Sequence, residues 1–424
     1  MKEHRMRVIV IGGGTGGMCL AHGLRRAGVD VRVFERHRTR TDGLHGYRVG
    51  IDPDGSRALK ACLPPDVYDL FVRTCARPPE TFAFLDERLR RTLTVPLRTP
   101  TDDVNDEKSV SRMTLRQVLY TGMTDVVRFG SDFTHYEQTE TEITAYFADG
   151  SSVTGDLLVG ADGTNSRVRA QKLPHARVED SGVVAIGGKV PLTGETRALL
   201  PEGVFPGIGL VLAPRGMACI LHVMEFPWGP GGGSPVPGDP TVDHINWGVS
   251  AHRDRFPADV TGLDGPRLVA QTLAMTPRWS PALRRLFTLT DPATCFPINI
   301  RTSVPVPAWP TDRVTLLGDA IHTMTPGQGV GANTALRDAH NLVRALTSGS
   351  RSPRVYERQM LDYGFAAVAA SKARTGGDQL VHRPVIGRLA LAGQRAFLRT
   401  TDRVPALKRR FEASLYTTRG GDRE

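Results

Sequence analysis

The chain has 424 residues and a mass of 46.1 kDa, which is long enough to bury a large core and to form two or three domains. Its hydrophobic content of 40% and charged content of 23% are those of an ordinary globular protein, and no apolar run reaches the length of a membrane span. The formal net charge is +10, but the arginines are dispersed without interleaved aromatic residues, so we expect neither a nucleic-acid nor a membrane partner.

The cysteines and the first residues bear on metal binding and on location. The five cysteines are scattered and odd in number, which favours free thiols over a disulfide framework or a metal site. Residues 1–7 lead directly into a strand pattern and lack the apolar core and cleavage site of a signal peptide. We therefore expect a cytoplasmic protein without a metal ion.

The first chemical motif is a β-α-β unit at the N-terminus. Residues 7–11 form a β-branched run typical of a buried parallel strand, residues 18–27 have a helical pattern, and a second strand at 31–34 ends in Glu35. The glycine-rich turn between strand and helix satisfies G-x-G-x-x-G through Gly12, Gly14 and Gly17.

Each part of this unit has a physical reason to bind a dinucleotide. Gly12 permits a tight turn, Gly14 lets the backbone approach a pyrophosphate, and Gly17 lets helix and strand pack closely. The helix N-terminus offers N–H groups to the phosphates, and Glu35 can accept hydrogen bonds from ribose hydroxyls. The predicted cofactor-binding set also includes the adjoining residues Thr15, Gly16 and Arg36.

Two further strand-to-turn segments follow much later in the chain. Residues 157–169 read as a buried strand running into a turn at Asp162, whose carboxylate can serve the turn or reach a ligand. Residues 313–317 read as another buried strand, followed by Gly318, Asp319 and a glycine-rich stretch, with a helical pattern at 332–346. This last segment combines an acceptor for a sugar hydroxyl with N–H donors for an electron-rich ring oxygen.

In this order, the three segments resemble the class A flavoprotein monooxygenases, the family of para-hydroxybenzoate hydroxylase and salicylate hydroxylase. The family's second motif, Asp-Gly-x-x-Ser-x-x-Arg, is matched by Asp162, Gly163, Ser166 and Arg169. Its third motif, Gly-Asp-Ala-x-His with a downstream Pro and Gly-x-Gly, is matched by Gly318, Asp319, Ala320, His322, Pro326, Gly329 and Gly331.

The resemblance implies a bound FAD and assigns residues to its parts. The first motif would hold the ADP part, Asp319 would bind the ribityl chain, and residues 326–331, Val330 included, would line the isoalloxazine. The family also places arginines near the flavin, at positions matched by Arg48 and Arg112. Ordinary surface charge is the alternative for both arginines.

The three motifs must converge on one cofactor, and this requirement predicts the domain organisation. We predict an α/β fold in which a Rossmann-type FAD-binding domain (1–75, 100–180 and 290–345) is interleaved with a mostly antiparallel substrate-domain sheet (76–99 and 181–289). Residues 346–424 are expected to form C-terminal helices that pack on the core through apolar positions such as Val385, Ile386, Leu389, Leu391, Phe397 and Leu398. The Gly- and Pro-rich stretch 228–243 reads as a mobile loop, either a lid or an inert excursion.

The resemblance implies a monooxygenase in which NADPH or NADH reduces FAD and a flavin C4a-hydroperoxide delivers oxygen to an aromatic or polyketide-like small molecule, by hydroxylation or epoxidation. The sequence does not identify a catalytic base, although His45 and His222 are candidates by location. A flavin-dependent halogenase is disfavoured because the Trp-x-Trp-x-Ile-Pro signature is missing. A protein that keeps FAD and uses its pocket for non-redox cyclisation or substrate binding stays open, as does the oligomeric state.

Overall fold

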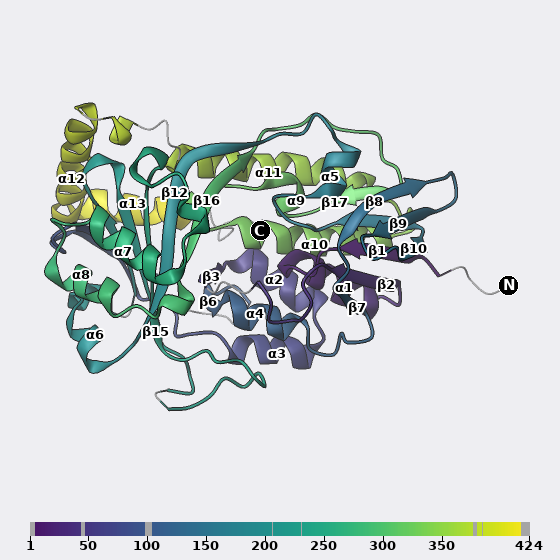
Figure 1. Ribbon diagram of the computed structural model, residues 1–424, viewed down its shortest axis with the longest axis horizontal. Helices are drawn as coiled ribbons and strands as arrows, with labels where there is room; N and C mark the ends of the chain where they lie inside the picture. Colours follow the sequence, from purple (N-terminus) through teal and green to yellow (C-terminus); the bar gives the residue numbers. More distant parts are fainter. Residues whose placement is uncertain are drawn as a thin grey trace.

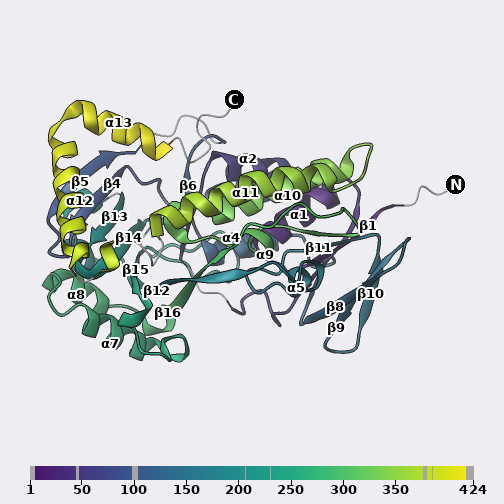
Figure 2. The ribbon, with the colours of Figure 1, turned by 90° about the horizontal axis from the view of Figure 1, so that it is seen from above.

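The computed structural model describes residues 5–43, 47–97, 104–205, 207–229, 231–375, 380–383 and 385–416. Figures 1 and 2 show an elongated molecule in which a parallel sheet with its helices lies toward one end and a larger sheet toward the other. The predicted α/β fold, with a Rossmann-type unit and a mostly antiparallel second sheet, is confirmed. The predicted domain boundaries stay predictions.

The parallel sheet carries the three motif strands side by side in the order β17-β11-β1-β2-β7. All four neighbouring pairs are parallel, so the carboxyl ends of the motif strands meet at one edge. The strands β1, β2, β11 and β17 are fully or largely buried, as expected for a sheet covered on both faces, whereas β7 at the edge is half-buried to exposed. Their bounds are β1 Arg7–Ile11, β2 Asp30–Glu35, β7 Val127–Phe129, β11 Leu157–Gly160 and β17 Val314–Leu316.

Helices surround this sheet and connect its strands. Helices α1 and α10 pack against each other and α2 packs against α10, so that the two glycine-rich helix starts belong to one helical layer. The helices of this half are α1 Thr15–Arg26, α2 Pro53–Cys62, α3 Pro65–Arg73, α4 Arg112–Leu119, α5 Arg167–Lys172, α9 Asp319–His322, α10 Gly331–Thr347 and α11 Arg354–Thr375.

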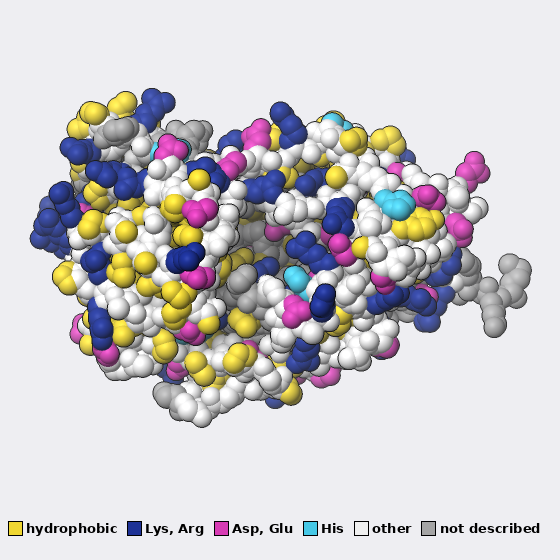
Figure 3. Space-filling view, in the orientation of Figure 1, with side chains coloured by type: hydrophobic (Ala, Val, Ile, Leu, Met, Phe, Trp, Pro, Cys, Tyr) yellow, Lys and Arg dark blue, Asp and Glu magenta, His cyan; other side chains and the backbone are white. Residues whose placement is uncertain are grey.

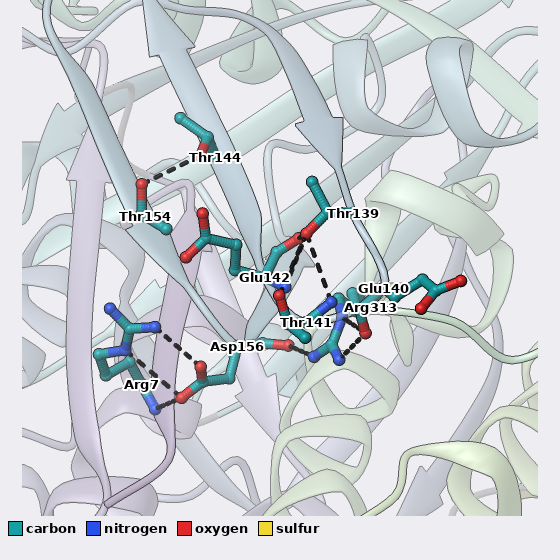
Figure 4. Close-up of polar contacts among 9 residues, drawn as sticks. All are labelled: Arg7, Thr139, Glu140, Thr141, Glu142, Thr144, Thr154, Asp156 and Arg313. Carbon is teal, nitrogen blue, oxygen red and sulfur yellow. Dashed lines mark hydrogen bonds and ion pairs between the residues drawn. The ribbon is translucent and has the colours of Figure 1, made fainter. Parts of the chain in front are cut away.

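Two small antiparallel units adjoin the parallel sheet. One is the sheet of β8 Phe133–Gln138, β9 Ile143–Phe147 and β10 Ser152–Gly155, and the other is the pair β3 Arg48–Ile51 and β6 Lys108–Ser111. Figure 4 shows how polar contacts fasten the three-stranded unit: Arg7 pairs with Asp156 at 2.9 Å, and Arg313 donates to the carbonyl oxygen of Asp156 at 3.0 Å and to that of Glu140. These contacts lie on the side of the parallel sheet opposite its carboxyl ends.

The second sheet has the order β16-β12-β15-β14-β13-β4-β5 and is antiparallel except for the β13–β4 pair. Its strands are β4 Thr81–Asp86, β5 Arg91–Pro96, β12 Val178–Pro191, β13 Gly207–Leu212, β14 Ala218–Met224, β15 His244–His252 and β16 Phe296–Ser303. Strand β16 thus joins this sheet although its residues fall within the 290–345 segment predicted for the FAD-binding domain.

One face of the second sheet is covered by helices. Trp247 on β15 and Phe287 on α8 meet with ring centroids 4.9 Å apart, within an apolar core that also takes in α7. The helices are α6 Gly194–Ala198, α7 Gly265–Met275 and α8 Pro281–Thr288. The other face is covered by the C-terminal helices at β4, β5 and β13, whereas at β12 it meets α4 of the FAD-binding half, where Lys189 contacts Met113.

The C-terminal helices α12 (Ile386–Arg403) and α13 (Pro405–Tyr416) lie at the end of the molecule formed by the second sheet, as both views show. Leu391 and Leu398 are buried there, but Leu389 and Phe397 are 73% and 56% exposed. The expectation that all these apolar positions pack on the core is therefore wrong for Leu389 and Phe397, because they lie on the outer face of α12. Val385 and Ile386 are exposed as well. Among the described helices, none has the length and hydropathy needed to cross a membrane.

Candidate functional site

The turn between β1 and α1 is built so that only glycine fits at two of its positions. Gly12 has φ +108°, and a Cβ added there would lie 2.3 Å from the carbonyl oxygen of Ala161. A Cβ added at Gly17 would lie 2.2 Å from the carbonyl oxygen of Gly12. At Gly14, by contrast, a Cβ would meet no atom within 4 Å, and the residue is exposed. The turn is thus closely packed on its protein side and open where a ligand would approach.

Glu35 lies beside this turn, at the end of β2. Its side chain is buried, and its carboxylate accepts hydrogen bonds from the backbone N–H of Gly13 at 2.8 Å and from that of His37 at 3.0 Å. Arg116 lies 3.9 Å from the same carboxylate, and the hydroxyl of Tyr120 donates to the carbonyl oxygen of Gly13 at 2.8 Å. The acid therefore fixes the turn and retains lone pairs for a further donor.

Sequence reasoning missed Arg116 and Tyr120. Both follow Arg112 at intervals of four residues, so the three side chains share one face of α4 and its cap. The spacing of four residues from Arg112, which is itself a predicted site residue, is the sequence signal that would have identified them.

Asp162 is engaged within its own turn. One carboxylate oxygen accepts from the Ser166 hydroxyl at 2.6 Å and the other from the Arg167 backbone N–H at 2.8 Å. Burial raises the pKa of this carboxyl, against the effect of these hydrogen bonds. The structure thus gives Asp162 a role in the turn, and its contact with a cofactor stays a prediction.

Arg169 joins the second motif to the third. Its buried guanidinium donates to the carbonyl oxygen of Ala320 at 2.8 Å and to that of Thr164 at 2.9 Å. The two segments are far apart in sequence, so this side chain fixes their relative position at the carboxyl edge of the parallel sheet.

Asp319 begins α9, immediately after β17, and lies near Arg112 at the start of α4. Its side chain is accessible to solvent, yet burial by the surrounding protein raises its pKa, while the charges of His322 and Arg112 oppose this shift. This combination is expected of a carboxyl that is surrounded by protein but open to solvent. Figure 3 shows a hollow between the two halves of the molecule.

A buried polar network supports the backbone at Asp319. The carboxylate of Asp338 on α10 accepts from the backbone N–H of Gly318 at 2.7 Å, from the ring of His322 at 2.6 Å and from the hydroxyl of Tyr363 at 2.5 Å. Burial alone would lower the pKa of His322, but the charge and hydrogen bond of Asp338 outweigh burial and raise it. His322 and Asp338 therefore form a buried, hydrogen-bonded pair behind the motif.

The segment from Pro326 to Gly331 turns the chain into α10. Pro326 to Gln328 form one 3-10 turn, Gly329 has φ +67°, and α10 begins at Gly331 without a side-chain cap. The first N–H groups of the helix have no acceptor within it, so they are available to an electron-rich ligand atom. Pro326 and Gly329 are exposed, whereas Val330 is buried.

The remaining predicted residues differ in their surroundings. Arg48 donates to the Ser109 hydroxyl at 2.9 Å and pairs with Glu107 at 3.4 Å, within the β3–β6 pair. Arg36 is exposed after β2, and Thr15 and Gly16 form the first turn of α1. The roles predicted for these four residues in cofactor binding stay predictions.

The two candidate bases are also placed differently. His222 is half-buried on β14, in the second sheet. His45 lies outside the described residues. All five cysteines are buried and free of disulfides, and the described residues hold no cluster of metal ligands.

The Gly- and Pro-rich loop 228–243 reaches across to the FAD-binding half. Asp239 accepts from the Thr114 hydroxyl on α4 at 2.8 Å, the carbonyl oxygen of Pro237 accepts from Arg40 at 3.1 Å, and Val236 is buried in the core around the parallel sheet. The described residues of the loop, 228–229 and 231–243, form neither helix nor strand, as predicted, and the loop is anchored at these points. Its function as a lid stays a prediction.

Comparison with known proteins agrees with this architecture. Residues 5–49 and 285–356 match the family model for an FAD binding domain. A structure from Photorhabdus luminescens assigned as an FAD-containing monooxygenase is 32% identical and superposes with a TM-score of 0.77 over 87% of this chain and 97% of that one. An FAD-dependent urate hydroxylase from Klebsiella pneumoniae is 29% identical over 371 residues, which cover 84% of this chain and 86% of that protein.

A further relative is a dual O-methyltransferase/FAD-dependent monooxygenase from Cercospora beticola, 31% identical over 415 residues. The match covers 92% of this chain but 46% of that protein, so the chain spans about half the length of this relative. The chain belongs to the FAD-dependent class A flavoprotein monooxygenases.

The residues of the site fit FAD. The open backbone at Gly14 leaves room for a pyrophosphate, and Asp319 offers an accessible acceptor at the carboxyl edge of the parallel sheet. The uncapped start of α10, twelve residues after Asp319, offers N–H donors. These features complement the anionic, hydroxylated and electron-rich parts of the cofactor, respectively.

Proposed function

We propose that the chain is an FAD-dependent monooxygenase that uses NADPH or NADH and O₂ to hydroxylate or epoxidise an aromatic or polyketide-like small molecule, through a flavin C4a-hydroperoxide. The observation that carries this proposal is that Asp319 lies beside the charge of Arg112 directly after the parallel strand β17, and that α10 begins soon after it without a side-chain cap. Membership of the flavoprotein monooxygenases supports it.

Each residue of the site has a specific task in this reaction. The N–H groups at the start of α1 would bind the pyrophosphate, and Glu35 would accept from the adenosine ribose. Asp319 would accept from the ribityl chain. The start of α10 would stabilise negative charge on the flavin ring, since the positive end of a helix dipole favours an anion.

FAD, when bound, supplies the redox and oxygen chemistry. The protein would hold the substrate against the ring and exclude water from the hollow. The pocket side of the second sheet would form the wall on which the substrate lies.

The experiment that tests this proposal is a visible spectrum of the purified protein under anaerobic conditions, before and after addition of NADPH and again after air is admitted. Flavin bands that bleach and recover, followed by substrate-dependent NADPH consumption in an aromatic panel, are the expected result. Flavin that stays oxidised with every substrate would instead favour non-redox use of the pocket. A protein that cannot be loaded with FAD would refute the proposal.

A further inference from the structure

A row of polar side chains crosses the second sheet on the face turned away from α7 and α8. Lys189 on β12 pairs directly with Asn246 on β15, and Asn246 pairs with His222 on β14. Directly paired residues of an antiparallel sheet project on the same side, so these three side chains form one row. The alternate residues Val190 and Trp247 lie in the core beneath.

The ammonium of Lys189 has no ion-pair partner among the described residues. Its one described polar contact is the sulfur of Met113 on α4, at 4.0 Å. Asp239 acts on it electrostatically, but that carboxylate already accepts from the hydroxyls of Thr114 and Thr241, both at 2.8 Å. Burial lowers the pKa of Lys189, which means that the charged form is costly here without an anion beside it.

The polar groups beside Lys189 are fixed in orientation and are neutral. His244 Nδ1 lies 2.6 Å from the carbonyl oxygen of Val242, to which it donates, and the amide nitrogen of Asn246 donates to His244 Nε2 at 3.0 Å. Burial and the charge of Lys189 lower the pKa of His244 to about 3, so this ring carries no charge near neutral pH. Lys189 is therefore the cationic member of the group.

The neighbouring row of the same face is flat and apolar. Gly187 and Gly248 pair with each other, Phe296 pairs with Gly187, and Ile220 pairs with Gly248. A Cβ added at Gly187 would lie 3.2 Å from the Phe296 ring, and one at Gly248 would lie 3.3 Å from Ile220. The end of the Phe296 ring thus lies against Gly187 and the Ile220 side chain lies against Gly248, so that these two side chains form an apolar floor over the paired glycines.

This floor is connected to the predicted flavin site. The ring of Tyr47 lies 5.9 Å from that of Phe296, and the guanidinium of Arg112 lies 5.5 Å from the Tyr47 centroid. Arg112 is also the residue whose charge acts on Asp319. The apolar floor therefore lies between Lys189 and the group of Tyr47, Arg112 and Asp319.

We propose that the apolar floor formed by Phe296 and Ile220 over Gly187 and Gly248 holds a planar aromatic substrate and that Lys189 binds an acidic oxygen of that substrate in its anionic form. This inference rests on the proposed function and narrows its substrate class to aromatic compounds that carry an anionic oxygen at one edge. The charge would fix the orientation of the ring, because the anion must point toward Lys189 and away from the Phe296 side of the floor.

The test compares two probes of equal shape, 2-naphthoate and 2-naphthamide, in binding to the FAD-loaded enzyme without NADPH. Calorimetry and the change in the flavin spectrum both report the dissociation constants. We expect the wild type to bind naphthoate more tightly than the amide. Lys189→Met should weaken naphthoate binding about 10- to 100-fold, as expected for loss of a charge-assisted hydrogen bond, and leave amide binding within about twofold.

Two further variants control this comparison. Lys189→Arg keeps the charge and should retain most of the preference for the anion. Lys372→Met removes an exposed lysine on α11 and should behave as the wild type. Because Lys189→Met replaces an unpaired, half-buried charge by an apolar chain of similar length, we expect it to fold at least as stably as the wild type.

An anion preference that is absent from the wild type, or that survives in Lys189→Met, would overturn the assignment. So would failure of both probes to bind, since the floor and the ammonium are sufficient to hold a bare naphthoate. Failure of the proposed function is recognised separately, as flavin that NADPH does not reduce, because the binding measurements need no turnover.

Discussion

His244 makes the structure sensitive to acid in a way that can be measured. Its ring is 4% exposed, and burial together with the charge of Lys189 lowers its pKa from 6.5 to about 3. Between these two pH values the unfolded chain binds a proton that the folded protein excludes. The free energy of unfolding therefore falls as the pH is lowered through this window, and this contribution is absent above pH 6.5.

The magnitude follows from the size of the shift. Each pH unit below the unfolded pKa costs about 1.4 kcal/mol, so that His244 should contribute a loss of about 2 kcal/mol on going from about pH 7 to about pH 5. Its effect reaches about 5 kcal/mol near pH 3, an order-of-magnitude limit. For a chain of this size, a loss of about 2 kcal/mol lowers the melting temperature by a few degrees.

The perturbation is His244→Gln, whose amide can donate to Val242 and accept from Asn246 but does not titrate. Urea unfolding of both proteins at about pH 7 and about pH 5 gives the four free energies that are needed. The titrations of carboxylates common to both proteins cancel when the pH-dependent loss of unfolding free energy in His244→Gln is subtracted from that in the wild type. His175→Gln, at an exposed position, is the matched histidine control. If the free energy of unfolding falls equally in the wild type and in His244→Gln between these two pH values, the reasoning is refuted.

The remaining predictions concern the cofactor half. Gly17→Ala should impair both folding and FAD retention, because its Cβ would lie 2.2 Å from the Gly12 carbonyl oxygen. Gly14→Ala should leave the urea midpoint unchanged and weaken FAD binding. Equal FAD affinity of Gly14→Ala and the wild type would contradict the assignment of this turn to the phosphates. Asp319→Ala should weaken FAD binding about 10- to 100-fold in a flavin fluorescence titration, through loss of a ribityl acceptor, and full flavin occupancy would count against this role. Tyr363→Phe removes the 2.5 Å hydrogen bond to Asp338 and should lower the free energy of unfolding by about 1–2 kcal/mol, so an unchanged urea midpoint would mean that the network does not depend on this hydroxyl.

Local patterns were sufficient to predict the cofactor half. The β-α-β unit lies within residues 7–35, and the strands before Asp162 and Asp319 are short continuous runs, so that periodicity and turn chemistry identify them directly. Parallel strands present their carboxyl ends at one edge, which brings the three motifs together. The class of cofactor came from the resemblance of the three motifs to a known family.

Contacts between distant segments could not be predicted in the same way. The row formed by Lys189, Asn246 and His222 depends on the register of strands that are joined by long connections. Helix α12 has apolar residues on two faces, and periodicity does not say which face meets the core, so Leu391 and Phe397 looked alike in the sequence.

The start of α4 joins the two halves of the site through three consecutive residues. Arg112 acts on Asp319, Met113 contacts Lys189, and Thr114 donates to Asp239 in the loop that crosses from the second sheet. A single helical turn thus touches the predicted flavin site, the proposed anion subsite and the anchored loop. Oxygen transfer requires the ring carbon to be held at a defined distance from the flavin, and a rigid helix common to both subsites can set that distance where two independent loops could not.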